Sequence, residues 1–482
     1  MRRITYSCMR RWLFLSTNSL SLLSTEKDSA AKYMMLSSLI WLIVPSLLGL
    51  FLAIKLVWPD FLNQSPYLSF GPMRTVHTNG VLLGWLSMVQ VGAMYYMLPR
   101  LLNTTLWSER LGNVTVWMWN IGMTIGAGTL FMGITSGVEY AELIWPLDLY
   151  IVVMVSLVIL NAFMTVAQRQ ERQFYVSVWY FLGSMVWLPL VYLVGNVPVE
   201  MIHVPGVHQL NMNWFLGHNI LGLWFTTMGV AMVYYLLPKV TGLPIYSHKL
   251  SLIGFWTIAI FYVWNGPHHL ANGPIPPWLQ KAGIVPSLLM IIPVWTVIAN
   301  VFGTIKNQMN LIRDNVIVKY LITAGIFYLA ACLQGPFQSF MSVSAVLKFT
   351  HWTVGHAHMA PFATFTFIGM AAMYYIIPRL TGQSLYSWSL ANWTYWLGTL
   401  GFLVMGLSLW TAGVMQGFAW IDGKDFMAVV EAIRPYMLLR ILGGAMMMAS
   451  MVVFLWNMVM TVRTSQAKIP LEQSDQKVMV QS

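Results

Sequence analysis

Long apolar runs are the feature that most limits what this chain can fold into. Such a run needs about 20 residues to cross the roughly 30 Å of hydrocarbon in a bilayer as an α-helix. Only 9% of the residues are charged, whereas soluble domains carry about 25%. The sequence therefore predicts an all-α membrane protein with twelve transmembrane helices, near residues 35–57, 76–98, 113–134, 147–167, 175–195, 214–237, 251–267, 283–304, 318–341, 354–377, 391–414 and 437–461.

Lysine and arginine predict the orientation of these helices. They gather in the N-terminal segment, in the loops after even-numbered spans and in the C-terminal tail, as Arg100, Lys239 and Arg313 illustrate. Cytoplasmic loops carry this excess of basic residues, so we expect both termini to be cytoplasmic. The formal net charge of +11 then requires no nucleic-acid partner, because the lipid bilayer and its positive-inside rule account for it.

A single membrane domain is expected. We predict a cytoplasmic tail at residues 1–33, a twelve-helix domain at 34–463 and a polar cytoplasmic tail at 464–482. The N-terminal tail has a second interpretation, a start codon chosen too early. We find no internal repeat and no separate soluble domain. Cys8 and Cys332 alone exclude a disulfide framework, and the lack of a CxxCH motif excludes a covalently attached c-type haem.

Histidine is the residue type that points to chemistry. Given the predicted orientation, six of the ten histidines lie in the outer half of the membrane at similar depth. Polar side chains inside a membrane are rare and usually functional, and imidazole is the side chain that most often binds Cu, Fe and Zn. This layer predicts a metal centre formed by His77, His218, His268, His269, His356 and His358.

The spacing of His356 and His358 predicts two cofactors rather than one. Each residue of an α-helix turns by about 100°, so these two imidazoles point about 200° apart and cannot share one ion. They can each bind a planar cofactor on opposite sides of one helix. One of them would hold an iron with an open axial site, and the other would pair with His77 on the iron of an electron-transferring haem.

His268 and His269 have the opposite geometry. They are adjacent residues at a helix end, where Gly266 and Pro267 break the regular turn, and they can converge on one ion. A third imidazole from His218 would complete a set of three nitrogens with an open position for a substrate, as redox catalysis at copper requires.

Several stretches resemble the catalytic subunit I of the haem–copper oxidase superfamily, and most closely that of the cbb3-type (C-family) cytochrome c oxidases. The similarity covers roughly residues 35–463. The double histidine and the HxH pattern are typical of the superfamily, and HTN, GHN and EYAEL are typical of the C-family. The stretches are FGPMRTVHTNG around His77, SGVEYAELIWP at 136–146, GHNILG at 217–222, YSHKLSLIGFW at 246–256, WNGPHHL at 264–270, HWTVGHAHMAP at 351–361 and LLRILGGAM at 438–446.

The resemblance implies two b-type haems and one copper ion (CuB), with one calcium ion as a further candidate. It assigns the low-spin haem iron to His77 and His358 and the high-spin haem iron to His356. The copper ligands that it implies are His218, His268 and His269.

Other residues receive roles from the same resemblance. Tyr262 matches the tyrosine that this family links covalently to a copper-ligating histidine, and that gives one electron and one proton as a tyrosyl radical. Without the resemblance, Tyr262 would be a core tyrosine with a hydrogen-bonded hydroxyl. Arg74 and Arg440 match arginines that pair with haem propionates, and Glu139 matches a calcium ligand. A proton track from the cytoplasm is implied at Tyr234, Ser251, Asn300 and Tyr328, for which interhelical hydrogen bonding is the alternative.

The chain departs from the family at three positions. Gln334 stands where relatives usually carry a glutamate near the proximal haem ligand. A neutral amide should make the high-spin haem easier to reduce, because it does not raise the basicity of the imidazole as a carboxylate would. Gly254 replaces a histidine of the proton track, and Ile144 replaces a third carboxylate. None of these departures touches a metal ligand.

The implied function is that of a terminal respiratory oxidase in a bacterial inner membrane. It would reduce O₂ to water with electrons from soluble cytochrome c, delivered through membrane-anchored c-type cytochrome subunits, and would take up and pump protons. Nitric oxide reductase is the main alternative, since it shares the fold and the six histidines but uses glutamates near its second metal. Gly222, one turn after His218, and Tyr262 favour copper and O₂. A proton-coupled transporter would bind no haem, which the histidine layer argues against.

Overall fold

The computed structural model describes residues 24–463, and every regular element in that range is helical. Eleven helices of this part of the chain are long and apolar enough to cross a membrane. The remaining predicted span coincides with α5 (Glu109–Phe131), which has the length of its neighbours but falls short of their apolarity. The prediction of an all-α membrane protein is confirmed. The predicted tails fall largely outside the described residues, and the first described helix begins at Ser29.

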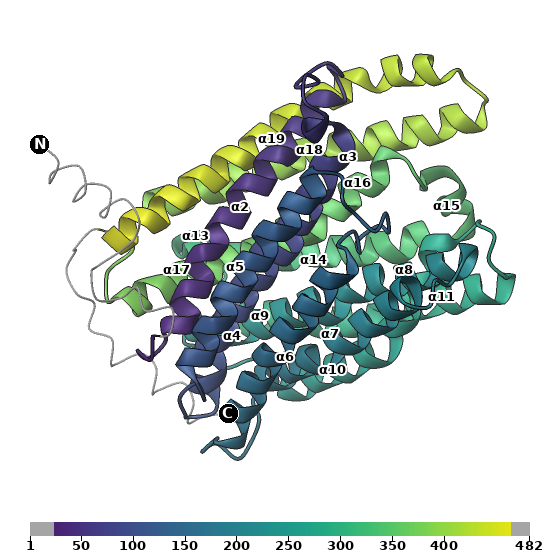
Figure 1. Cartoon of the computed structure of the whole chain (residues 1–482). Helices are drawn as coiled ribbons and strands as arrows, with labels where there is room; N and C mark the ends of the chain where they lie inside the picture. Colours follow the sequence, from purple (N-terminus) through teal and green to yellow (C-terminus); the bar gives the residue numbers. More distant parts are fainter. Residues whose placement is uncertain (1–23, 464–482) are drawn as a thin grey trace, which may run out of the picture.

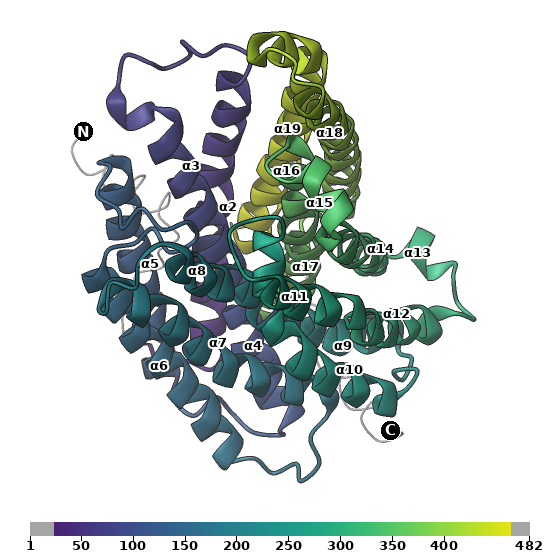
Figure 2. The same ribbon diagram turned by 90° about the vertical axis from the view of Figure 1, so that its right-hand side faces the viewer.

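The helices follow one another in antiparallel order through the bundle (Figures 1 and 2). The first part of the chain contains α2 (Ser29–Lys55), η1 (Pro66–Leu68), α3 (Phe70–Asn79), η2 (Gly80–Leu86), α4 (Ser87–Leu101), α5, α6 (Trp145–Ala167) and α7 (Val176–Glu200). The middle contains α8 (Gly206–Ile220), η3 (Leu221–Thr226), α9 (Thr227–Thr241), α10 (His248–Phe261), η4 (Tyr262–Trp264), η5 (Gly266–Leu270), α11 (Pro277–Leu289), α12 (Ile291–Ile305) and α13 (Leu311–Asp314). The last part contains α14 (Val316–Ser339), α15 (Met341–Leu347), α16 (His351–His358), η6 (Met359–Thr366), α17 (Phe367–Thr381), α18 (Trp388–Ile421) and α19 (Phe426–Arg463).

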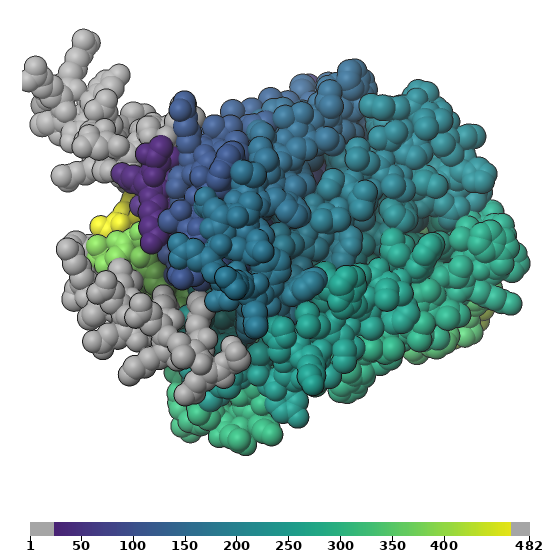
Figure 3. Space-filling model, turned by 90° about the horizontal axis from the view of Figure 1, so that it is seen from below, coloured from purple at the N-terminus to yellow at the C-terminus, as the bar shows by residue number. Residues whose placement is uncertain are grey.

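Three long helical segments form the centre of the bundle. They run over residues 70–101, 206–241 and 351–381 and are the most deeply buried spans among the described residues. The lipid-facing helices surround them, with α18 and α19 as a long antiparallel pair beside α2 (Figure 1). Seen from below, the first part of the chain, in blue, meets the middle, in teal and green, along a continuous surface (Figure 3).

Each central segment contains a π-helical turn close to a histidine. The turns are η2, η3 and η6, and they begin three residues after His77, three residues after His218 and directly after His358. A π turn inserts one extra residue into the helix and is frequent at functional sites. The three turns therefore re-orient the helices next to the predicted ligands.

The expectation of no internal repeat is wrong. Each central segment ends in Tyr-Tyr-x-x-Pro followed by a basic residue, at 95–100, 234–239 and 374–379. In each case the next helix begins after a serine N-cap, whose side chain accepts a hydrogen bond from a backbone N–H: Ser108, Ser247 and Ser387. We call residues 70–167, 206–305 and 351–463 the first, second and third repeats. The pattern escapes simple inspection because few other residues are shared.

An asparagine and a threonine on the last helix of each repeat complete the pattern. The serine N–H donates to the asparagine Oδ1 at 3.1, 2.9 and 3.1 Å in the first, second and third repeats. The preceding residue's N–H donates to the threonine Oγ1 at 3.0, 3.1 and 3.0 Å. Since unpaired buried N–H groups are costly, these clamps fix where each of the three turns meets the bundle. The clamp pairs are Asn161 and Thr165, Asn300 and Thr304, and Asn457 and Thr461.

Candidate metal centre

Three imidazoles from the second repeat meet at one point. The ligand atoms of His218, His268 and His269 all lie within 4.8 Å of one another. His218 Nδ1 is 3.0 Å from His269 Nε2, and His218 Nε2 is buried without a hydrogen-bond partner. Three imidazole nitrogens without a carboxylate suit copper, so the residues present fit the copper ion that the sequence implies.

Local geometry explains why adjacent histidines can converge. The chain leaves α10 through two short 3₁₀ turns, η4 and η5, and the second of them carries His268 and His269. A β-carbon at Gly266 would collide with the backbone of Trp214 on α8, so the glycine lets this turn approach His218. The Trp214 ring stacks on His269 with ring centroids 3.9 Å apart.

Two side chains that hold these imidazoles were not predicted from the sequence. Ser287 Oγ on α11 lies 2.6 Å from His268 Nδ1, and Trp214 covers one face of His269. Trp214 stands one helical turn before His218, and that spacing was an available signal. Ser287 comes from a helix with no motif of its own, so only the tertiary structure identifies it.

A second pair of imidazoles lies between the first and third repeats. The rings of His77 and His358 face each other with centroids 6.2 Å apart and planes at 21°. Each Nδ1 is 2.8 Å from a backbone carbonyl oxygen, that of Pro45 or Val354. An N–H at Nδ1 leaves the Nε2 lone pair free for a metal. With metal–nitrogen bonds of about 2 Å, this spacing fits one iron held between two imidazoles.

His356 turns away from this pair, as the spacing predicted. Its Nδ1 lies 3.3 Å from Gln334 Oε1 on α14, whereas the His358 ring faces His77. His356 is also close enough to His218 and His268 to act on them electrostatically. The imidazole therefore stands between the three-histidine group and α14, where it fits the iron of a second haem. Gln334 is the side chain that contacts it, as expected.

Tyr262 lies against the three-histidine group. Its ring stacks on His218 with ring centroids 4.4 Å apart and planes at 17°. A β-carbon at Gly222 would overlap the Tyr262 ring atoms. The glycine and the tyrosine are therefore complementary, because this ring position requires that residue 222 have no side chain.

Three of the four predicted proton-track residues form one connected group. Asn300 Nδ2 donates to Ser251 Oγ at 2.9 Å and to the Tyr234 hydroxyl at 3.4 Å. Tyr328 lies apart from this group on α14, one helical turn before Cys332. Cys332 in turn is close enough to Tyr262 to act on it electrostatically.

The predicted propionate and calcium residues lie on the outer side of the histidines. Arg440 is close enough to His77 and His358 to act on them electrostatically. Arg74 forms an ion pair with Glu139. Glu142 Oε2 accepts a hydrogen bond from Asn79 Nδ2 at 3.0 Å, and burial raises the pKa of Glu142.

The acidic residues of this loop do not by themselves form a calcium site. Arg74 engages the Glu139 carboxylate, whereas a calcium ion takes six to eight oxygen ligands. Within residues 24–463, only the His218 group brings three potential metal-binding side chains together. The calcium ion therefore stays a prediction.

Comparisons with known proteins show the family of this chain. The family model for cytochrome c and quinol oxidase polypeptide I matches residues 29–446. A cytochrome c oxidase subunit 1 homolog of Agrobacterium tumefaciens is 33% identical over 90% of this chain and 84% of its own length. A cbb3-type cytochrome c oxidase subunit CcoN1 of Stutzerimonas stutzeri is 32% identical over 90% of this chain and 94% of its own length.

Two further comparisons concern more distant proteins. A nitric oxide reductase subunit of Stutzerimonas stutzeri is 25% identical over 90% of this chain and 95% of its own length. A haem–copper terminal oxidase solved as a dimer by cryo-electron microscopy has a TM-score of 0.76 at 16% identity, over 92% of this chain and 86% of that one, and so shows the shared fold. This multi-pass membrane chain thus belongs to the haem- and copper-binding oxidase subunit I family, in its cbb3-type cytochrome c oxidase branch.

Proposed function

We propose that this chain is the catalytic subunit of a terminal oxidase that reduces O₂ to water at a centre made of a high-spin b-type haem and copper. The observation that carries the proposal is the meeting of His218, His268 and His269 beside Tyr262 and Gly222. The catalytic domain is proposed to span residues 34–463, with cytoplasmic tails at 1–33 and 464–482.

The histidines divide into three ligand sets in this proposal. His77 and His358 hold the low-spin haem, His356 holds the high-spin haem, and the His218 group holds copper. When bound, these groups supply electron transfer and the reduction of O₂. The protein keeps Nε2 of His77 and of His358 available by engaging Nδ1, for which the contacts of His77 with Pro45 and of His358 with Val354 are the support.

Tyr262 and the proton track supply protons to the centre. The Tyr262 phenol stacks on His218 and can give one proton and one electron. Ser251, Asn300 and Tyr234 form the cytoplasmic end of the track, and their mutual hydrogen bonds support this role. Tyr328 continues the track toward Tyr262, with Cys332, one helical turn after Tyr328, between them. Arg74 and Arg440 would neutralise haem propionates on the outer side.

Partner subunits carry the electrons to this chain in the proposal. No CxxCH motif is present in the sequence, so membrane-anchored c-type cytochromes that receive electrons from soluble cytochrome c are the proposed donors. Protons are taken from the cytoplasm, and a share of them is pumped outward. The family membership and the cbb3-type relatives support this assembly.

Purified complex separates this proposal from nitric oxide reduction. We expect two b-type haems and one copper per chain, and O₂ turnover well above NO turnover measured side by side. The reason is that residue 222 offers no carboxylate and that the Tyr262 ring occupies the space where one would extend. Non-haem iron in place of copper, with NO turnover exceeding O₂ turnover, would refute it.

A further inference from the structure

A buried carboxyl group on the outer side takes no part in the chemistry above. Asp148 lies in the first turn of α6 and is 8% exposed. Its Oδ1 accepts a hydrogen bond from the Tyr192 hydroxyl on α7. Its Oδ2 is buried and has no hydrogen-bond partner in the described part of the chain.

The surroundings of Asp148 favour its protonated form. Within residues 24–463, no lysine or arginine forms an ion pair with it, and the facing titratable groups are Tyr192 and Glu200, both on α7. An ionised carboxylate without a cation is costly in a membrane. The Oδ2 atom is therefore the natural position for a proton, because Oδ1 already accepts the phenol hydrogen.

A polar stripe leads from Asp148 to the outer surface. Tyr192, Asn196 and Glu200 are spaced by four residues on α7, and so lie on one face of the helix. Asn196 is 5% exposed and donates to the Tyr192 carbonyl oxygen at 3.2 Å. Glu200 ends the helix and is less buried, and it acts electrostatically on Asp148. The stripe thus runs along α7 from the tyrosine that contacts the buried acid to a second acid at the end of the helix.

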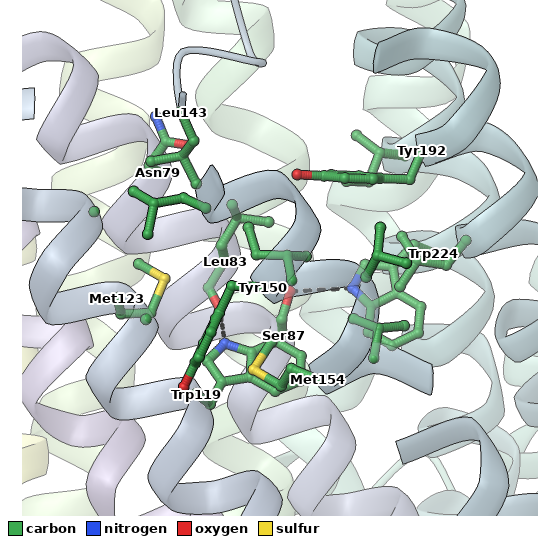
Figure 4. Close-up of a pocket in the computed structure, with 18 of the residues that line it drawn as sticks. Asn79, Leu83, Ser87, Trp119, Met123, Leu143, Tyr150, Met154, Tyr192 and Trp224 are labelled. Carbon is green, nitrogen blue, oxygen red and sulfur yellow. Dashed lines mark hydrogen bonds between the residues drawn. The ribbon is translucent and has the colours of Figure 1, made fainter. Parts of the chain in front are cut away.

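On its inner side, Tyr192 borders an apolar cavity that reaches the haem-binding part of the molecule. Tyr192 and Asn79 both line this cavity, and Figure 4 shows the Tyr192 hydroxyl directed across it toward Asn79 and Leu143. Asn79 in turn holds Glu142, whose Oε1 is the other carboxylate oxygen that is buried without a partner among the described residues. Tyr192 and Tyr262 also pack against the same apolar cluster of Val191, Leu216 and Leu223.

We propose that Asp148 is a proton-binding site on the outer side of the protein, from which protons that leave the catalytic centre pass to Glu200. The inference rests on the proposed oxidase function. In each transfer, an O–H bond forms at Asp148 Oδ2 as the bond to the inner donor breaks. That O–H bond then breaks as the Glu200 carboxylate accepts the proton. Tyr192 keeps Oδ1 occupied, so that only Oδ2 exchanges.

Infrared difference spectroscopy of the whole complex tests the site independently of turnover. We expect a carbonyl band of a protonated carboxylic acid that shifts in ²H₂O, disappears in Asp148→Asn and moves in Asp148→Glu. Tyr192→Phe should shift the same band, because Oδ1 loses its donor. Asp60→Asn, an exposed acid of the outer loop after α2, is the matched control and should leave it unchanged. A band that survives in Asp148→Asn overturns the site.

Proteoliposomes test the exit role. With the complex reconstituted, Asp148→Asn should release at least threefold fewer protons per O₂ to the outside, with O₂ consumption within about twofold of the wild type. If Asp148→Asn loses the infrared band but releases as many protons per O₂ as the wild type, Asp148 carries a proton in the wild type, but its role in the exit is refuted. If the wild-type complex does not reduce O₂, the proposed function fails, and the infrared result still decides whether Asp148 carries a proton.

Discussion

The second repeat differs from the first and third at both of its ends. At the cytoplasmic end all three share the serine–asparagine clamp, and the first motif tyrosine lies beside the asparagine in each. The asparagine amide of the first and third repeats donates to the serine carbonyl oxygen, at 3.0 and 2.8 Å. In the second repeat it donates to Ser251 Oγ instead. The equivalent positions, four residues after the N-cap, are Gly112 and Ala391.

At the outer ends, too, the second repeat differs from the first and third. His77 of the first repeat and His358 of the third face each other, whereas His218 of the second turns to His268, His269 and Tyr262. In the proposed function, one scaffold thus carries an electron-transfer pair between two repeats and a reactive group within the other. The repeat that departs from the common hydrogen bonding is the one that is proposed to bring protons and substrate together.

The largest effect should come from removing a histidine of either group, and the two groups should lose different properties. His218→Ala should reduce O₂ turnover by at least about 10³-fold, as expected when one member of a catalytic unit is removed, and should leave the low-spin haem spectrum intact. His77→Ala should remove that spectrum, because the facing pair with His358 is broken. Optical spectra and O₂ consumption of both variants measure this. Loss of the low-spin haem spectrum in His218→Ala would contradict the assignment of His77 and His218 to different metals.

The apolar segments and the grouping of the six histidines were accessible from the sequence for physical reasons. A membrane span must satisfy its backbone internally, so each helix appears as an apolar run, and all twelve predicted segments coincide with helices. The opposite directions of His356 and His358 follow from helical geometry alone, and their contacts with Gln334 and His77 agree with it.

What the sequence left open depends on contacts between distant segments. The clamp of Ser247 by Asn300 joins residues of different helices, and a π turn has no strong sequence signal. Asn300 was predicted for the proton track, with interhelical hydrogen bonding as the alternative, and its Oδ1 makes an interhelical hydrogen bond that Asn161 and Asn457 share. The recurring Tyr-Tyr-x-x-Pro motif was the available signal.

Gly222→Ala tests whether the second repeat needs the space that Gly222 leaves for the Tyr262 ring. A β-carbon there would overlap Tyr262, so we expect a loss of about 1–3 kcal/mol of stability, the usual cost of overpacking, together with loss of O₂ turnover. Thermal loss of haem absorbance and O₂ consumption are the measurements. Gly128→Ala is the control, since its β-carbon would meet nothing within 4 Å. Normal turnover in Gly222→Ala would show that the ring position is not required.

Ser251→Ala makes the second repeat resemble the third, which has Ala391 at this position. The clamp to Ser247 stays, but the Asn300 amide loses its Ser251 acceptor. We expect O₂ turnover and proton uptake from the cytoplasmic side to fall together by about tenfold, equal to about 1.4 kcal/mol in the barrier, with unchanged haem spectra. Ser156→Ala, which removes an exposed hydroxyl that bonds only within its own helix, should change neither. Uptake at the wild-type rate would remove Ser251 from the track.

The smallest effect on catalysis should come from breaking the clamps of the other two repeats. Asn161→Ala and Asn457→Ala each leave a serine N–H without its acceptor, which costs about 1–3 kcal/mol and should lower the temperature at which haem is released. Turnover per bound haem should stay within about twofold, because neither asparagine contacts the track of Ser251 and Tyr234. Asn300→Ala should show the same loss of stability and in addition the proton-uptake defect of Ser251→Ala. If all three variants behave alike, Asn300 is only a clamp, and the specialisation of the second repeat does not extend to its cytoplasmic end.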